Sequence, residues 1–339
     1  MKKINLNQVN HNSQSKVFIG ENGGGKSSVL RQLADYYISS GELVLGISNC
    51  LHDKFDINSK KFKCLSVKHG EVVYSRAIVD ALSNIEDDNV RSVLGRALDY
   101  CGYMDEIGIS LPVYNKNNAQ NINDIYWIPI NNFYPSLGHN NKSNLLVSFL
   151  SNNKVDYELN IFLKNKYDEI IPFEMISSGQ ANKISTLAYI ASNLRDGLVI
   201  MVDEPENSLH PKWQREYIDN IFNVFYGKYF QLIVATHSPL IISSTCDIYE
   251  VADFKIIPKG AQNQNIEEKL WSLFDVVTPE NDFLSRYLVD VLDSYRSGFT
   301  SRGVAISKLH NISKSCIDER QINIINDLEE IIEDYHEEF

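Results

Sequence analysis

The sequence predicts an α/β fold in which buried, mostly parallel strands alternate with helices. Three observations lead to this fold class. A glycine-rich loop, Gly20–Ser27, lies between a short apolar run and a stretch of helical spacing. A second apolar run, at 198–202, ends in Asp203 and Glu204, and a third, at 230–235, leads to His237. Strands that alternate with helical segments indicate a parallel sheet whose carboxyl ends carry the polar residues.

Composition and charge set limits on the class of protein. The chain has 339 residues, is 43% hydrophobic and has a net charge of −12, which is enough apolar material for one large domain or two. The acidic balance argues against a surface that binds nucleic acid everywhere, but a local basic groove would be compatible with it. No membrane span or signal peptide is evident, so we expect a cytoplasmic location. The five cysteines include no C-x-x-C pair and are expected to be reduced thiols.

The first element is a strand at 17–19, followed by a loop with the spacing G-x-x-x-x-G-K-[ST]. Such a loop turns successive backbone N–H groups toward an anion, and the positive end of the next helix dipole favours the same charge. The spacing therefore predicts a triphosphate site, in which Lys26 reaches the β and γ phosphates and Ser27 binds Mg²⁺. The residues expected to contact ATP here are Asn22, Gly23, Gly24, Gly25, Lys26, Ser27 and Ser28.

Residues 42–145 are expected to supply two strands, at 43–47 and 62–67, and then an inserted, mainly helical and irregular lobe from about 77 to 145. A lysine cluster at 60–63 is most simply a solvated face. Within the lobe, the run at 125–130 reads as a strand that would return to the main sheet. That would place Asn131 or Asn132 near Mg²⁺ or the attacking water, although an ordinary polar loop is the simpler alternative.

A strand pair is expected over 147–165, and then a helix to Leu194 that begins near Ser177 and Ser178. The free N–H groups of its first turn are suited to bind an anion. At the end of the strand at 198–202, Asp203 is expected to hold Mg²⁺ through water and Glu204 to polarise the water that attacks the γ phosphate. His237, at the next strand end, is expected to contact the γ phosphate or the water.

Five ordered motifs together resemble the ABC-type ATPases, in the branch of soluble chromosome-maintenance, DNA-repair and phage-defence ATPases. They span residues 17–241: Walker A at Gly20–Ser27, the signature at 177–180, Walker B at 198–204, the D-loop region at 207–211, and the switch histidine His237. The resemblance implies a homodimer with two shared ATP sites. The residues expected to act in trans are Ser177, Ser178, Gly179 and Gln180.

The residues within these motifs indicate which ABC-type ATPases the chain resembles most. The form Asp203-Glu-Pro-Glu-Asn-Ser-Leu-His-Pro211 looks like the OLD-related and Septu-like defence ATPases, AAA-type ATP-binding proteins with an ABC signature. Transporter ATPases usually have an aspartate where Leu-His-Pro stands. The chain departs from the pattern in a short segment before Walker A, in Gly24 where Ser is common, and in lacking a clear Q-loop glutamine.

The division expected is an ATPase core at 1–258 and a helical C-terminal region at 259–339. In that region Thr278-Pro279 is suited to begin a helix and Gly298 to end it, and a last helix is expected at 319–335. Many OLD relatives carry a fused TOPRIM nuclease with a Glu and an Asp-x-Asp cluster, which the sequence does not show. We therefore expect an ATP-hydrolysing switch that controls a separate effector, a nuclease or toxin in anti-phage defence or DNA processing. Nucleic acid is a possible further partner. The alternatives are a transporter's nucleotide-binding subunit and an ATP-dependent assembly module without turnover.

Overall fold

The computed structural model divides the chain into two compact units, Met1–Lys259 and Gly260–Phe339. The residues that the structure describes are 3–50, 54–70, 72–110, 125–131, 159–243, 245–259, 266–274, 282–316 and 319–334. No helix among these residues has both the length and the apolar composition needed to cross a membrane. The assignment of an ATPase core to 1–258 stays a prediction.

The centre of the first unit is a seven-stranded sheet with the order β11-β10-β1-β9-β8-β2-β3. All neighbouring strands are parallel except β11, which closes a hairpin with β10. The strands are β1 (Ser15–Ile19), β2 (Val44–Ser48), β3 (Phe62–Ser66), β8 (Leu198–Asp203), β9 (Phe230–Thr236), β10 (Asp247–Ala252) and β11 (Lys255–Lys259). This is the α/β fold of a P-loop NTPase, as the sequence predicts.

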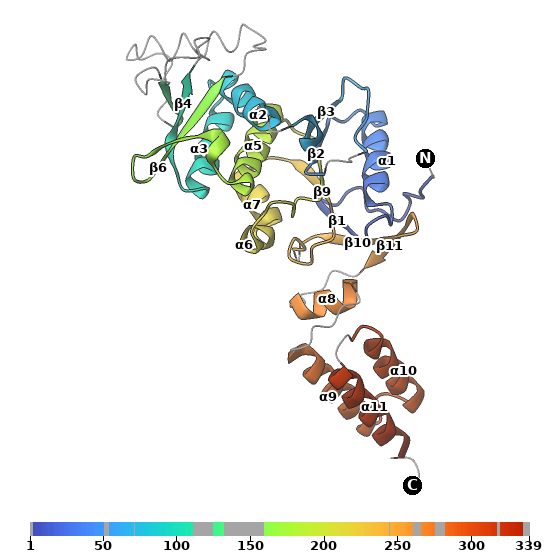
Figure 1. Ribbon diagram of the computed structural model, residues 1–339. Coiled ribbons are helices and arrows are strands. Elements are labelled where there is room, and N and C mark those ends of the chain that lie inside the picture. Colours follow the sequence, from blue (N-terminus) through green and yellow to red (C-terminus); the bar gives the residue numbers. More distant parts are fainter. Residues whose placement is uncertain are drawn as a thin grey trace. The chain divides into compact units, whose positions relative to one another are not determined.

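Helices cover both faces of this sheet, with α1 and α5 on opposite sides in Figure 1. On one side, α1 (Lys26–Ser39) buries Leu30, Leu33 and Ala34 in a core shared with Val199 and Ile233 of the central strands. On the other side, α5 (Ser178–Asn193) packs against α2 (Val72–Ser83) and α3 (Asp88–Tyr100). Among the described residues of this unit, the remaining helices are α6 (Pro211–Arg215) and α7 (Tyr217–Val224), with the short 3-10 turns η1 (Val67–His69) and η3 (Phe173–Met175).

A second, antiparallel sheet of four strands has the order β5-β4-β6-β7. Its strands are β4 (Tyr103–Ser110), β5 (Tyr126–Pro129), β6 (Asn160–Asn165) and β7 (Ile170–Pro172). The inserted region therefore contributes strands as well as helices α2 and α3. The expectation that the strand at 125–130 returns to the main sheet is wrong, because β5 pairs with β4 instead. Of the strand pair expected at 147–165, residues 147–158 lie outside the described part, as does Asn132.

The second unit is helical, with α8 (Ile266–Phe274), α9 (Asp282–Arg296), α10 (Arg302–Ser313) and α11 (Glu319–Asp334). Its core is apolar and is formed by Leu284, Leu288, Val291, Ala305, Leu309, Ile312, Ile325 and Ile332, among others. Gly298 has a φ of 72° just beyond α9, which confirms it as the residue that ends that helix. Thr278, Pro279 and Tyr335 lie outside the described residues.

Candidate functional site

The carboxyl ends of four neighbouring strands bring the predicted motifs to one edge of the main sheet. The register aligns Ile19 of β1 with Thr236 of β9, and Asp203 of β8 with Ala235 of β9 and Ser48 of β2. The predicted phosphate loop, the predicted Walker B acids, the predicted switch histidine and residues 49–50 all follow directly from these ends or lie at them. A parallel sheet collects ligand-binding loops at this edge, so sequence-distant residues meet there.

The loop between β1 and α1 has the backbone that phosphate binding requires. Gly20, Gly23 and Gly25 have φ values of 149°, 85° and 112°, which side-chain-bearing residues rarely adopt. The Lys26 ammonium donates hydrogen bonds to the Gly20 and Glu21 carbonyl oxygens at 2.7 and 3.1 Å. Lys26 is buried, so its charge is held against the loop.

Close packing against the β10–β11 hairpin explains why Gly24 stands where Ser is common. A Cβ atom on Gly24 would lie 2.8 Å from the backbone oxygen of Val251, and one on Gly20 would lie 2.3 Å from the same atom. A Cβ atom on Gly25 would lie 2.8 Å from the Phe254 ring. The hairpin therefore leaves no room for side chains along this side of the loop.

Glu204 follows β8 in a left-handed conformation, with φ 51°. Its Oε2 accepts hydrogen bonds from the Cys50 thiol at 3.0 Å and from Asn207 Nδ2 at 3.3 Å. Burial raises the pKa of this carboxyl group, but these two hydrogen bonds and the charges of His237 and Lys26 outweigh burial, so the pKa lies below its ordinary value. Glu204 is therefore ionised at neutral pH and lies within electrostatic reach of the phosphate-loop lysine.

Glu206 determines how His237 is placed. It is 8% exposed, and its Oε1 accepts hydrogen bonds from the Thr236 hydroxyl and the His237 backbone N–H, both at 2.7 Å. The same oxygen lies 3.0 Å from His237 Nδ1, whereas Glu204 Oε1 lies 3.7 Å from that nitrogen. An imidazole whose Nδ1 is bound to a carboxylate keeps Nε2 for another partner.

The signature segment begins α5 with a reciprocal cap between Ser177 and Gln180. A Cβ atom on Gly179 would lie 2.5 Å from the Ser208 carbonyl oxygen, so the signature packs directly on the D-loop of the same chain. An open hollow of about 490 Å³ lies over this helix start. Its lining is formed by Ser177, Ser178, Gly179, Gln180, Ser208, His210 and Trp213.

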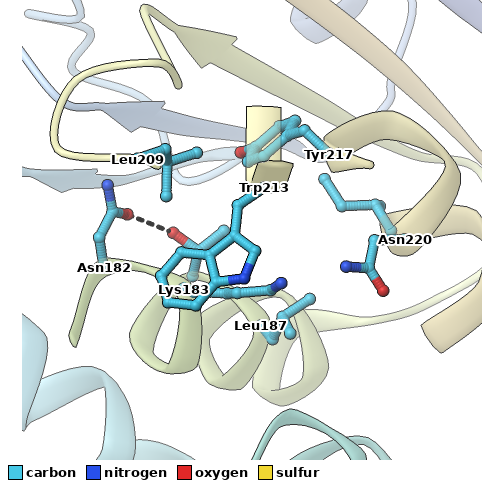
Figure 2. Close-up of a pocket in the computed structure, with 9 residues that line it drawn as sticks. Asn182, Lys183, Leu187, Leu209, Trp213, Tyr217 and Asn220 are labelled. Carbon is cyan, nitrogen blue, oxygen red and sulfur yellow. Dashed lines mark hydrogen bonds between the residues drawn. The ribbon is translucent and has the colours of Figure 1, made fainter. Parts of the chain in front are cut away.

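A smaller cavity of about 20 Å³, room for about one water, lies between α5, α6 and α7. Figure 2 shows the Trp213 indole lying across the Lys183 side chain in this cavity, with Leu187 and Tyr217 nearby. Lys183 Nζ lies 2.9 Å from the ring centroid of Tyr100 and 5.0 Å from that of Trp213. It has no hydrogen-bond partner within the described structure, and burial lowers its pKa to about 7.

Sequence reasoning missed four residues of this edge: Cys50, Lys54, Glu206 and Asn207. Lys54 Nζ donates to the Ser28 hydroxyl at 2.7 Å, which brings a second lysine to the phosphate loop. Glu206 and Asn207 lie inside the segment Asp203–Pro211 described above. Their polar side chains, so close to Glu204 in the sequence, could have indicated that they belong to the site. The signal for Cys50 was weaker and consisted of its position just past the buried strand β2.

Asn131 is not part of the site. Its side chain lies against Gly95 of α3, where a Cβ atom would be 2.5 Å from Asn131 Oδ1. Its backbone N–H donates to the Asp105 carboxylate. Of the two options for Asn131, the structure contradicts a place near Mg²⁺, because its strand belongs to the second sheet; the ordinary polar loop was the simpler option.

The donor atoms present fit magnesium bound together with a nucleotide. Asp203, 1% exposed, offers carboxylate oxygens, and Ser27 offers a hydroxyl; oxygen ligands of this kind suit Mg²⁺. Within the described ranges, no group of three or more His, Cys, Asp or Glu side chains is arranged to hold a metal alone. Mg²⁺ typically takes one or two protein oxygens and completes its shell with phosphate and water.

Comparison with known proteins gives one family match and several solved structures. The family model described as "AAA domain, putative AbiEii toxin, Type IV TA system" matches residues 125–243. CbiO1 from Clostridium perfringens, described as part of the ABC transporter complex CbiONQ, is 13% identical, with a TM-score of 0.35, over 73% of this chain and 77% of that one.

Two further structures are of the same distant kind. An ATP-binding cassette of an ABC transporter in its ADP conformation is 12% identical, with a TM-score of 0.36, over 77% of this chain and 85% of that one. The Smc head domain bound to the C-terminal domain of ScpA, from Pyrococcus furiosus, is 15% identical, with a TM-score of 0.27, over 57% and 38% of the two chains. The family match covers residues 125–243, about a third of the chain, and includes the segments 177–180, 198–204 and 207–211 and His237.

Proposed function

We propose that this chain binds Mg-ATP, closes as a homodimer around it, hydrolyses it and thereby controls a separate effector. The observation that carries the proposal is the cluster at the sheet edge, where Glu204 and His237 lie side by side. Hydrogen bonds from Cys50 and Asn207, together with the charges of His237 and Lys26, outweigh burial and keep the pKa of Glu204 below its ordinary value. A carboxylate that stays ionised beside a phosphate loop is suited to orient a water for attack on the γ phosphate.

Each side chain has a separate task in this mechanism. Lys26 binds the β and γ phosphates, and Ser27 and Asp203 hold Mg²⁺, which supplies charge neutralisation on the phosphate oxygens when bound. Glu204 accepts a hydrogen bond from the attacking water through Oε1, because Cys50 and Asn207 already occupy Oε2. His237, fixed through Nδ1 by Glu206, directs Nε2 toward the γ phosphate.

The signature hollow supports a site shared between two copies. Ser177, Ser178, Gly179 and Gln180 line an open space at the start of a 16-residue helix, where backbone N–H groups and the helix dipole favour an anion. In the proposed dimer this hollow covers the triphosphate that the partner's phosphate loop holds. ATP thus joins the two copies, and hydrolysis releases them.

The C-terminal unit is the element that we propose contacts the effector. Residues 260–339 contain 16 Asp and Glu against 7 Lys and Arg, so this unit carries −9 of the net charge of −12. Several of its apolar side chains are exposed: Val289, Phe299, Val304, Ile324 and Ile331. Exposed apolar residues among acidic ones suit a protein partner with a basic surface, such as a nucleic-acid-binding nuclease or toxin, better than nucleic acid itself.

The variant Glu204→Gln tests the proposed function. Gln keeps the shape of Glu but loses the charge, so ATP binding should persist while hydrolysis falls by about a hundredfold, or about 3 kcal/mol in the barrier. Because hydrolysis reopens the dimer, light scattering with Mg-ATP should show the variant accumulating as a species of twice the mass.

Lys26→Ala is the control, since it should neither bind fluorescent ATP nor change mass. Hydrolysis by Glu204→Gln at the parent rate would remove Glu204 from the mechanism. Loss of hydrolysis without any change of mass would contradict the shared site, unless the parent is already a dimer. In that case, a cysteine beside Ser28 and another beside Ser178 should cross-link between copies only when ATP is present.

A further inference from the structure

The turn of the β10–β11 hairpin has an unusual backbone. Ala252 pairs with Lys255, so Asp253 and Phe254 form a two-residue turn, and both have positive φ, at 50° and 63°. Turns of this type favour Asn-Gly or Asp-Gly, because a side chain at φ above zero is strained and a bulky one most of all. Strained residues of this kind persist where the surrounding structure holds them, often next to a functional site.

Phe254 contacts the phosphate loop through both its backbone and its side chain. Its N–H donates a 3.0 Å hydrogen bond to the Gly24 carbonyl oxygen. Its ring lies so close to Gly25 that an added Cβ atom there would be 2.8, 3.2 and 3.3 Å from three ring carbons. The ring also packs against the core between α1 and the sheet. The hairpin therefore contacts the phosphate loop at two successive residues.

The hydrogen bond from Phe254 and the contact of its ring with Gly25 together hold the Gly24–Gly25 peptide in one orientation. In a planar trans peptide, the carbonyl of one residue and the N–H of the next point in opposite directions. Because the Gly24 carbonyl is directed outward to Phe254, the Gly25 N–H is directed to the opposite side, into the loop. Gly25 N–H donates no hydrogen bond within the described residues, and an N–H aimed into such a loop is a donor for an anion.

We propose that Phe254 is a positioning residue for the nucleotide phosphates: its N–H and its ring fix the Gly24–Gly25 peptide with the N–H of Gly25 aimed at the phosphate. This inference rests on the proposed function. It adds to the phosphate site a residue that lies about 230 positions after the glycine-rich loop in the sequence. The strain at Phe254 is consistent with this role, since a glycine would relax the turn but would leave the face of Gly25 uncovered.

The test compares Phe254→Asn with Phe254→Tyr and Asp253→Asn. Asn tolerates the left-handed conformation and keeps the backbone N–H, so the hairpin should form while the ring contact is lost. The Gly25 N–H faces the phosphates common to both nucleotides. Phe254→Asn should therefore weaken binding of Mg-ATP and Mg-ADP by the same factor, about tenfold, which is typical of one lost hydrogen bond to a charged group.

Calorimetric titration of the full chain with each nucleotide measures these affinities, and steady-state hydrolysis should show KM raised with kcat within about twofold. Phe254→Tyr keeps the ring and should bind like the parent, as should Asp253→Asn, which changes the same turn without touching Gly25. Thermal unfolding of all three variants should match the parent within about 2 °C.

Several results would overturn the inference: parent-like nucleotide affinity in Phe254→Asn, a loss confined to one nucleotide, equal loss in Asp253→Asn, or a fall in kcat together with a lower unfolding temperature. A parent chain that binds neither nucleotide would instead refute the proposed function, so the two failures are distinguishable.

Discussion

Glu206→Gln should lower both the stability of the first unit and its rate of hydrolysis. Glu206 is almost fully buried, its Oε1 accepts hydrogen bonds from the Thr236 hydroxyl and the His237 backbone N–H, and the same oxygen lies 3.0 Å from His237 Nδ1. Oε2 is buried and has no hydrogen-bond partner among the described atoms. A glutamine would keep its carbonyl oxygen at the position of Oε1 and would place its NH₂ group at the position of Oε2.

The magnitude follows from these contacts. Two hydrogen bonds lose the ionic component that makes bonds to a charged acceptor stronger, and the buried NH₂ group lacks an acceptor, at a cost of about 1–3 kcal/mol. We expect a loss of about 3 kcal/mol in the free energy of unfolding, or roughly 6–12 °C in the unfolding temperature. The Nδ1 contact of His237 weakens too, so hydrolysis should fall by about tenfold.

Differential scanning calorimetry and a phosphate-release assay measure the two effects. Glu174→Gln is the matched control, because Glu174 is exposed and the same substitution there should change neither quantity. A Glu206→Gln variant with the parent's unfolding temperature would contradict the account of the buried carboxylate. A destabilised variant that still hydrolyses ATP at the parent rate would show that His237 does not depend on Glu206.

Three further changes test other parts of the structure. Gly24→Ser should weaken nucleotide binding and lower the unfolding temperature, because its Cβ atom would lie 2.8 Å from the Val251 oxygen; fluorescent-nucleotide titration and calorimetry would check this. Ser178→Arg should leave ATP binding by the single chain intact but abolish ATP-dependent dimers and hydrolysis, as light scattering and phosphate release would show; loss of binding as well would indicate a site within one chain. Burial lowers the pKa of Lys183 from 10.5 to about 7. Between pH 7 and pH 10.5, Lys183 is therefore protonated in the unfolded chain and neutral in the folded chain. The free energy of unfolding should rise as the pH increases through this range. Urea unfolding at pH 7 and pH 9.5 should show this rise in the parent and not in Lys183→Met.

Local patterns were enough to predict the strands and loops that form the site edge. The apolar runs at 198–202 and 230–235 lie in β8 and β9, and the glycine spacing lies between β1 and α1. These signals are local, because buried strands and phosphate loops need particular residues at fixed spacing. The pairing of strands is not local, and for this reason β5 was recognised as a strand but assigned to the wrong sheet.

The spacing of residues in the sequence could not predict which side chains contact one another within the site. Cys50 and Glu204 are 154 residues apart, and Gly24 and Val251 are 227 apart, so nothing in the sequence shows that they touch. From the sequence, Gly24 was an unexplained departure from the usual Ser of the motif; the close approach of the β10–β11 hairpin explains it. Lys54 was overlooked in favour of the lysine cluster at 60–63, although Lys54 is the lysine of that connection that reaches Ser28.

The surroundings of Glu204 limit what it can do in the proposed reaction. Oε2 is occupied by the Cys50 thiol and by Asn207, while Oε1 lies near His237 at a distance too long for a strong hydrogen bond. A water can therefore approach Oε1 and not Oε2. Because the pKa of this carboxyl group is lowered, it is a weaker base than an ordinary glutamate, although it is fully ionised at neutral pH. Phosphoryl transfer requires little proton removal before the phosphate begins to leave, so a weak, fixed and charged acceptor is sufficient. Glu204 is thus better suited to orienting and polarising the water than to removing its proton early.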